Sequence, residues 1–169
     1  KLLEVFSASS NRLVNIPDWI SSLNRLKSLS LSENPIIEEL PESIGLLTEL
    51  RKADFSFMSL TSLPESIGQL SRLETLHVKS NNLISLPAST GDLGSLRFLT
   101  ANDNNLQTLP ASIGSLAKLV EADFSHNSLV TLPDSIGNCI SLKFLQISSN
   151  SLVSLPDSMA RLGLIMLDA

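Results

Sequence analysis

The chain of 169 residues contains one cysteine, so no disulfide can form within it. None of its asparagines is followed by x-Ser or x-Thr, so it also lacks an acceptor for N-glycosylation. Both absences favour a reducing, intracellular compartment, and we expect a cytoplasmic protein. Although 43% of the residues are hydrophobic, no apolar run approaches the roughly 18 residues that a membrane-spanning helix needs.

Basic residues are few as well. Twelve Lys and Arg stand against 17 Asp and Glu, which gives a net charge of -5. The basic residues form no cluster and no stripe, so nucleic acid is a poor candidate for a partner.

The chain has instead a clear period, because seven Leu-Pro or Ile-Pro dipeptides recur at steps of 23 or 24 residues. The dipeptides are Ile16-Pro17, Leu40-Pro41, Leu63-Pro64, Leu86-Pro87, Leu109-Pro110, Leu132-Pro133 and Leu155-Pro156. A fixed spacing of this length is typical of a stacked solenoid, in which each repeat buries its apolar face against its neighbours. We therefore expect the function to lie on surfaces.

Aligned on the prolines, the repeats read L-x-x-L-x-L-x-x-N-x-L-x-x-L-P-x-x-I-G-x-L-x-x. The first six positions alternate as a short strand does, and the proline opens a stretch that suits a single helical turn. We assign the repeats to 3–25, 26–49, 50–72, 73–95, 96–118, 119–141 and 142–163, with the start of an eighth at 164–169. We predict one array over 1–169, and because it has no polar caps we expect a fragment of a longer protein.

This pattern resembles the leucine-rich repeat family over essentially the whole chain. Its L-P-x-x-I-G-x-L form is similar to the intracellular 23-residue subgroup that includes Ras-suppressor proteins, Scribble and Erbin-type scaffolds and Roco-type arrays. The resemblance implies an α/β solenoid shaped as a horseshoe arc, with parallel strands on the concave face and short helical turns on the convex side. Extracellular members usually carry disulfide-rich caps, which this chain does not show.

One column of asparagines recurs at the ninth repeat position, where we predict a structural ladder of buried amides. With two donors and two acceptor lone pairs, each amide can bond backbone groups of its own coil and of the adjacent one. The ladder comprises Asn11, Asn34, Asn81, Asn104, Asn127 and Asn150.

The core columns compensate for volume, as a close-packed interior requires. Phe55 is paired with Ala53 and Phe124 with Ala122, so the fourth and sixth positions never both carry an aromatic ring. Cys139 replaces a core leucine and is expected to act as a small buried hydrophobe.

Two departures from the period fall together. One extra residue lies within 35–39, before Pro41, and Met58 occupies the ladder position of the third repeat. We expect a bulge and a broken ladder there, either as tolerated drift or as a dedicated binding feature.

The register also predicts which side chains face outward from the strands. Neighbouring entries of one column should lie about 4.8 Å apart, so the strands offer a platform of roughly 30 Å, which suits a protein surface. Exposed aromatic rings among charges are typical of interface anchors, so we expect Phe98 and Phe144 to be hot spots. We expect Arg97, Asp123 and His126 to set the orientation of the bound partner. Scattered surface aromatics are the alternative interpretation. The predicted protein-binding residues are Arg51, Lys52, Phe57, His77, Lys79, Arg97, Phe98, Asn102, Asp103, Glu121, Asp123, His126, Phe144 and Gln146.

Catalysis finds little support. Asp54 and His77 are neighbours in one column and Ser56 is close by, but an open sheet supplies neither an oxyanion hole nor an enclosing pocket. His77 and His126 lie two repeats apart, about 10 Å or more, which is too far to share a metal ion. The repeat glycines form no phosphate loop, so we expect no enzyme, cofactor or metal.

Three function classes remain open. In the first class, the chain is an interaction scaffold that binds a folded protein through its concave face. The resemblance implies a small GTPase, a phosphatase or a kinase as the partner. Alternatively, it is a structural subunit that contacts its neighbours through its ends. The third class is a substrate-recognition domain of a multidomain enzyme or a bacterial effector. The sequence leaves the oligomeric state undetermined.

Overall fold

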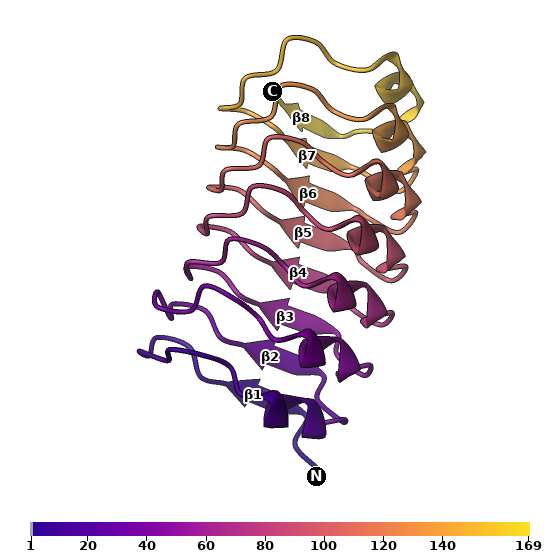
Figure 1. The fold of residues 1–169 in the computed structure, drawn as a ribbon. Coiled ribbons are helices and arrows are strands. Elements are labelled where there is room, and N and C mark those ends of the chain that lie inside the picture. Colours follow the sequence, from indigo (N-terminus) through magenta and orange to yellow (C-terminus); the bar gives the residue numbers. More distant parts are fainter. Residues whose placement is uncertain (1) are drawn as a thin grey trace.

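A computed structural model describes residues 2–169 as one parallel β-sheet, in which each strand pairs with the next along the chain (Figure 1). The strands within these residues are β1 (Val5–Ser7), β2 (Ser28–Ser30), β3 (Lys52–Asp54), β4 (Thr75–His77), β5 (Phe98–Thr100), β6 (Glu121–Asp123), β7 (Phe144–Gln146) and β8 (Met166–Asp168). The sheet stays open, and a short helical turn follows every strand except β8 on the opposite side of the stack. The predicted α/β repeat solenoid is therefore confirmed.

The helical turns are 3-10 helices of five residues each. They are η1 (Asp18–Ser22), η2 (Glu42–Leu46), η3 (Glu65–Gln69), η4 (Ala88–Asp92), η5 (Ala111–Ser115), η6 (Asp134–Asn138) and η7 (Asp157–Arg161). Each begins directly after a repeat proline, whose φ lies between -64 and -75°. The ring of proline holds φ near these values and the residue needs no N–H partner, which explains why the Leu-Pro dipeptide starts the turn.

Strand register follows the repeat period. Phe98 of β5 pairs with Glu121 of β6, and Glu121 pairs with Phe144 of β7. At the inserted residue the pairing shifts as the alignment requires, so that Ser28 meets Lys52. Side chains of the third and fifth repeat positions thus form continuous columns on one face of the sheet. We call this face, expected to be concave, the strand face.

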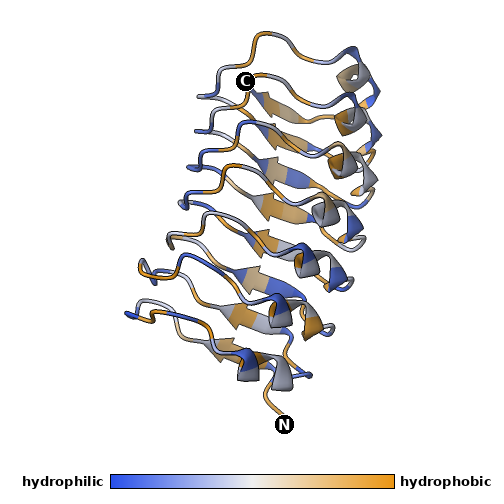
Figure 2. Cartoon of the chain, in the orientation of Figure 1, coloured by the Kyte–Doolittle hydropathy of each residue, from blue (hydrophilic) through white to orange (hydrophobic). Residues whose placement is uncertain are grey.

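Leucine and isoleucine columns fill the space between the sheet and the turns, and hydrophobic segments recur in every coil along the stack (Figure 2). Phe55 and Phe124 are fully buried, with relative exposures of 0%, and each has a buried alanine two residues earlier on its strand. The predicted volume compensation is confirmed. No helix within residues 2–169 is long and apolar enough to cross a membrane.

The repeat glycine permits close packing of successive turns. A Cβ placed on Gly91 would lie 2.4 Å from the backbone oxygen of Ser112 in the next coil. Real Cβ atoms essentially never come this close, so a side chain at this position would push the coils apart.

The inserted residue and Met58 prove to be one structural change. In other coils, the core residue two positions after the ladder position donates its backbone N–H to the ladder asparagine of the next coil. Leu60, for example, donates to Asn81 Oδ1 at 3.0 Å. In the inserted coil, the equivalent N–H of Ile37 donates instead to the backbone oxygen of Asn34 at 3.1 Å, which closes a local turn through Pro35. Because that donor is already satisfied, the next coil needs no amide, and Met58 is buried in the core with 5% exposure.

Candidate functional site

The ladder asparagines lie beside the sheet, where they bond the backbone of two coils. Asn104 donates through Nδ2 to the oxygens of Val78 and Ala101, at 3.0 and 3.2 Å, and its Oδ1 accepts from the N–H of Leu83 at 3.0 Å. Asn34, Asn81, Asn127 and Asn150 repeat this pattern between their own coils. These amides hold backbone groups and leave nothing free for chemistry.

Asn11 differs from the rest of the ladder. It is exposed, and its Nδ2 donates only to oxygens of its own coil, those of Ala8 and Ser9, both at 3.0 Å. The expectation of a buried amide is wrong at Asn11, because no preceding coil among the described residues offers it a partner.

The predicted binding residues all lie on or beside the strand face. Lys52, Phe98, Glu121 and Phe144 share the third-position column, and His77, Asp123 and Gln146 share the fifth. Arg51 and Arg97 precede their strands, while Lys79 and Asn102 follow theirs. The remaining three, Phe57, Asp103 and His126, occupy the loops after β3, β5 and β6.

These three loop residues share a backbone conformation that the sequence did not predict. Their φ values are 55, 54 and 53°, in the left-handed region that L-residues seldom adopt. Every residue at this eighth repeat position does the same, from Ser10 to Ser149, so the conformation belongs to the coil and not to one site. Phe57 and His126 are both exposed at this position.

Two cations already lie over aromatic rings at this face. The Lys79 ammonium lies 5.1 Å from the ring centroid of Phe57, and the Arg97 guanidinium lies 5.5 Å from that of Phe98. Arg51 is held by Glu74 of the next coil, at 2.5 Å. Three of the predicted basic residues are thus held by neighbours, which orders their side chains.

Asp54 and His77, neighbours in the fifth column, bond other partners. His77 Nδ1 is hydrogen-bonded to Thr100 Oγ1 at 2.8 Å, and Asp54 Oδ1 accepts from the N–H of Ser56 at 3.0 Å. Among residues 2–169, no hydrogen bond links the carboxylate, the imidazole and the serine hydroxyl. The three side chains therefore lack the contacts of a nucleophile and its base.

The centre of the strand face contains an open hollow of about 380 Å³, although the sequence predicted no pocket there. It arises because short side chains such as Ser56 and Thr100 alternate with longer ones along β3 to β6. Two buried atoms at the hollow, Ser56 Oγ and Asn102 Oδ1, have no hydrogen-bond partner. Its lining is Asp54, Ser56, His77, Lys79, Thr100, Asn102 and Asp123. A comparison of the fifth and seventh columns would have revealed these short residues.

Within the described residues, no three His, Cys, Asp or Glu side chains are grouped so that they could hold a metal ion. Cys139 is buried, its Sγ lies 3.3 Å from the oxygen of Ile113, and burial raises the pKa of its thiol from 9.0 to about 11. A thiol with so high a pKa is a poor nucleophile near neutral pH.

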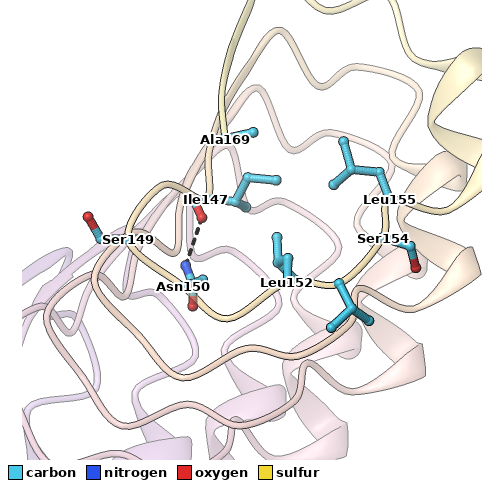
Figure 3. Close-up of a pocket in the computed structure, with 8 residues that line it drawn as sticks. Ile147, Ser149, Asn150, Leu152, Ser154, Leu155 and Ala169 are labelled. Atoms are coloured by element: carbon cyan, nitrogen blue, oxygen red, sulfur yellow. Dashed lines mark hydrogen bonds between the residues drawn. The ribbon is translucent and has the colours of Figure 1, made fainter.

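The last described coil carries a second hollow, of about 280 Å³, which is mostly apolar (Figure 3). Leu152, Leu155 and Ala169 line it, and the ladder bond from Asn150 Nδ2 to the oxygen of Ile147, at 2.8 Å, lies at its edge. This hollow holds no ionisable side chain, so the strand face remains the better candidate site.

Comparison with known proteins agrees with this geometry. The family described as "Leucine Rich Repeat" matches residues 25–47 and 118–139. A leucine-rich repeat protein of Leptospira interrogans has a solved structure that is similar over 92% of this chain and 40% of its own, with 37% identity and a TM-score of 0.87. The ectodomain of the Arabidopsis thaliana receptor kinase GASSHO1/SCHENGEN3, solved in complex with CASPARIAN STRIP INTEGRITY FACTOR 2, is similar over 93% of this chain and 22% of its own, with 30% identity and a TM-score of 0.73.

One curated relative is an adenylate cyclase of Schizosaccharomyces pombe, which is 40% identical over 60 residues. That segment covers 36% of this chain and 4% of the cyclase. This chain spans less than half the length of each of these three proteins. The repeat period, the parallel open sheet and these likenesses agree, and together they support a leucine-rich repeat family for this chain.

Proposed function

We propose that this chain is an interaction scaffold that binds a folded protein through the strand face. The proposed partner is a small GTPase, a phosphatase or a kinase of cytoplasmic signalling. The leucine-rich repeat fold is commonly a protein-interaction domain, and the plant receptor ectodomain similar to this chain was solved in complex with CASPARIAN STRIP INTEGRITY FACTOR 2. The partner class is carried over from the subgroup that the sequence resembles.

The observation that carries this proposal is a change in the outward columns along the stack. At β1 and β2 the third and fifth positions are Val5, Ser7, Ser28 and Ser30, which carry no charge. From β3 to β7 the same columns carry most of the charged and aromatic residues of the face, whereas the core columns stay apolar throughout. Packing cannot require this change, because these side chains point away from the core, so recognition is the simpler explanation.

The test uses a variant that alters the face without removing a hydrogen bond of the fold. Lys52 is exposed, its side chain forms no bond with residues 2–169, and Phe98 is half-buried, so Lys52→Glu with Phe98→Ala changes charge and contact area together. The matched control is Lys118→Glu with Leu46→Ala, two exposed residues away from the strand face. Binding is measured by biolayer interferometry against a panel of purified small GTPases, phosphatases and kinase domains.

We expect at least one panel protein to bind, the strand-face variant to lose affinity about tenfold or more, and the control to bind as the wild type does. Equal binding by the strand-face variant would show that the interface lies elsewhere. If no panel protein binds, the proposed partner class is wrong.

A second candidate function is a recognition array within a larger enzyme. The 60-residue likeness to the fission yeast adenylate cyclase favours it, because that enzyme contains a segment of similar sequence. Both candidates use the same face. They differ in whether the bound protein is a regulator or a substrate, which a turnover assay of the full-length protein would show.

A further inference from the structure

Glu121 is a charged residue of the strand face whose side chain the fold leaves unpaired. Its side chain is half-buried at the start of β6 and forms no hydrogen bond or ion pair with any residue of 2–169. Asp123, two residues later on the same strand, uses Oδ1 to accept from the N–H and the hydroxyl of Ser125, at 3.0 and 2.6 Å. Its other carboxylate oxygen forms no bond within the described chain, so β6 presents two carboxylates from residues whose Cα atoms lie about 7 Å apart along the strand.

The neighbouring strand provides an aromatic wall. Phe144 of β7 pairs directly with Glu121 in the register, and its side chain is half-buried. The rings of Phe57 and Phe98 each lie beneath a cation of this chain, but no cation of residues 2–169 lies over Phe144. This chain therefore stacks cations on exposed phenylalanines twice, and at Phe144 it offers the same ring beside an unpaired carboxylate.

The cations closest in the sequence and register do not neutralise this pair. Arg97 lies over Phe98, on the far side of Glu121 from Phe144. Lys143 donates through Nζ to the backbone oxygen of Gly163 at 3.1 Å. The negative charge of Glu121 and Asp123 is thus directed toward whatever covers the strand face.

We propose that Glu121, Asp123 and Phe144, here named the β6 site, bind an arginine side chain of the protein partner. A guanidinium is planar, so it stacks on the Phe144 ring while its N–H groups donate to the two carboxylates. An ammonium lacks both the plane and the fork of donors, which makes lysine the poorer ligand. This inference rests on the proposed function, because it requires a partner on the strand face, and it adds the chemistry of one contact.

The experiment titrates the full chain with blocked peptides in which three arginines alternate with glycines, and follows backbone amide shifts by NMR at low salt. Matching peptides carry citrulline, which has the same shape without the charge, or lysine. The arginine peptide should shift the amides of β6 and β7 in a saturable manner, and the citrulline peptide should not. Glu121→Gln and Phe144→Leu should each weaken binding about three- to fivefold, which corresponds to one exposed cation–ring or ion-pair contact.

Glu39→Gln provides the matched control, since Glu39 is exposed, carries the same charge and forms no bond with residues 2–169. The inference is overturned if Glu121→Gln binds no more weakly than Glu39→Gln, if the shifts map away from β6 and β7, or if no shift occurs. Equal binding of the lysine peptide would overturn the assignment to arginine. A panel protein that loses binding to the Lys52→Glu, Phe98→Ala variant but not to Glu121→Gln would sink the β6 site and leave the proposed function intact.

Discussion

At the residue scale, asparagines in the same ladder column contribute differently to the fold. Asn104 is 8% exposed and serves two coils, whereas Asn11 is exposed and bonds only its own. Replacing Asn104 by alanine leaves the buried Leu83 N–H without a partner. The Val78 oxygen loses the bond from Asn104 but keeps the one from Asn81 Nδ2, at 3.0 Å. Unsatisfied buried groups cost about 1–3 kcal/mol each.

We therefore expect Asn104→Ala to lower the free energy of unfolding by about 1–3 kcal/mol. Asn11→Ala should lower it by less than about 1 kcal/mol, because water can replace the lost partner. Urea denaturation followed by circular dichroism measures both. Similar losses at the two positions would contradict the ladder as described.

Cys139 makes the free energy of unfolding depend on pH in the alkaline range. Burial holds the thiol pKa at about 11 in the folded chain, against 9.0 for the free group. Above pH 9 the unfolded chain releases this proton while the folded chain keeps it, so the thiol favours unfolding increasingly as the pH rises from 9 to 11. Its stabilising contribution is fully present below pH 9.

The comparison of the wild type with Cys139→Ala isolates this effect, because the two proteins share every other ionisable group. The stability difference between them should be constant below pH 9 and should move in favour of the alanine variant between pH 9 and 11. Denaturant unfolding at a series of pH values gives this difference. A flat difference across the whole range would mean that the folded thiol ionises as easily as a free one.

At the scale of the elements, the stacking of the 3-10 turns depends on the repeat glycine. Gly91→Ala places a methyl group 2.4 Å from a backbone oxygen, whereas the nearest atom to a Cβ on Gly94, three residues later, lies 4.0 Å away. Overpacking of this kind costs about 1–3 kcal/mol. Thermal unfolding should therefore show a clear loss for Gly91→Ala and almost none for Gly94→Ala.

The inserted residue and Met58 should behave as a coupled pair. Met58→Asn buries an amide whose expected donor, the Ile37 N–H, is already bonded to Asn34, so the single change should destabilise the fold. Deleting Ile36 opens the local turn and should destabilise it as well. Together the two changes restore a regular ladder, and the double variant should be more stable than their sum by about 1–2 kcal/mol. Additive effects in a double-mutant cycle would show that the insertion and Met58 are independent.

The strands and turns were predicted well from the sequence, because the residues that cause them recur in every repeat. Proline fixes the start of each turn, alternating leucines select the strand faces, and the register then follows coil by coil. Contacts formed by residues that depart from the repeat could not be predicted from the period. The bond from the Ile37 N–H to Asn34 and the His77 to Thr100 contact involve particular atoms that no repeat pattern specifies.

At the scale of the whole molecule, the stack separates its structural residues from those that remain for binding. The residues that repeat from coil to coil lie in the buried columns and the ladder, and the residues that do not repeat lie on the strand face. Predicting that face from the register was possible because a parallel sheet preserves columns. Its central hollow does not follow from the period, because the residues that line it differ from coil to coil. Only a comparison of the fifth and seventh columns, residue by residue, points to it.

The central claim, that a protein partner covers the strand face, is tested most directly by site-specific photo-crosslinking. Benzoylphenylalanine is placed at Phe98 on β5 in one protein, and at Leu46 in another, where the side chain is 57% exposed on η2. Each protein is irradiated with the panel protein that binds the wild type. The account predicts a covalent adduct from position 98 and none from position 46, and an adduct from position 46 without one from position 98 would contradict it.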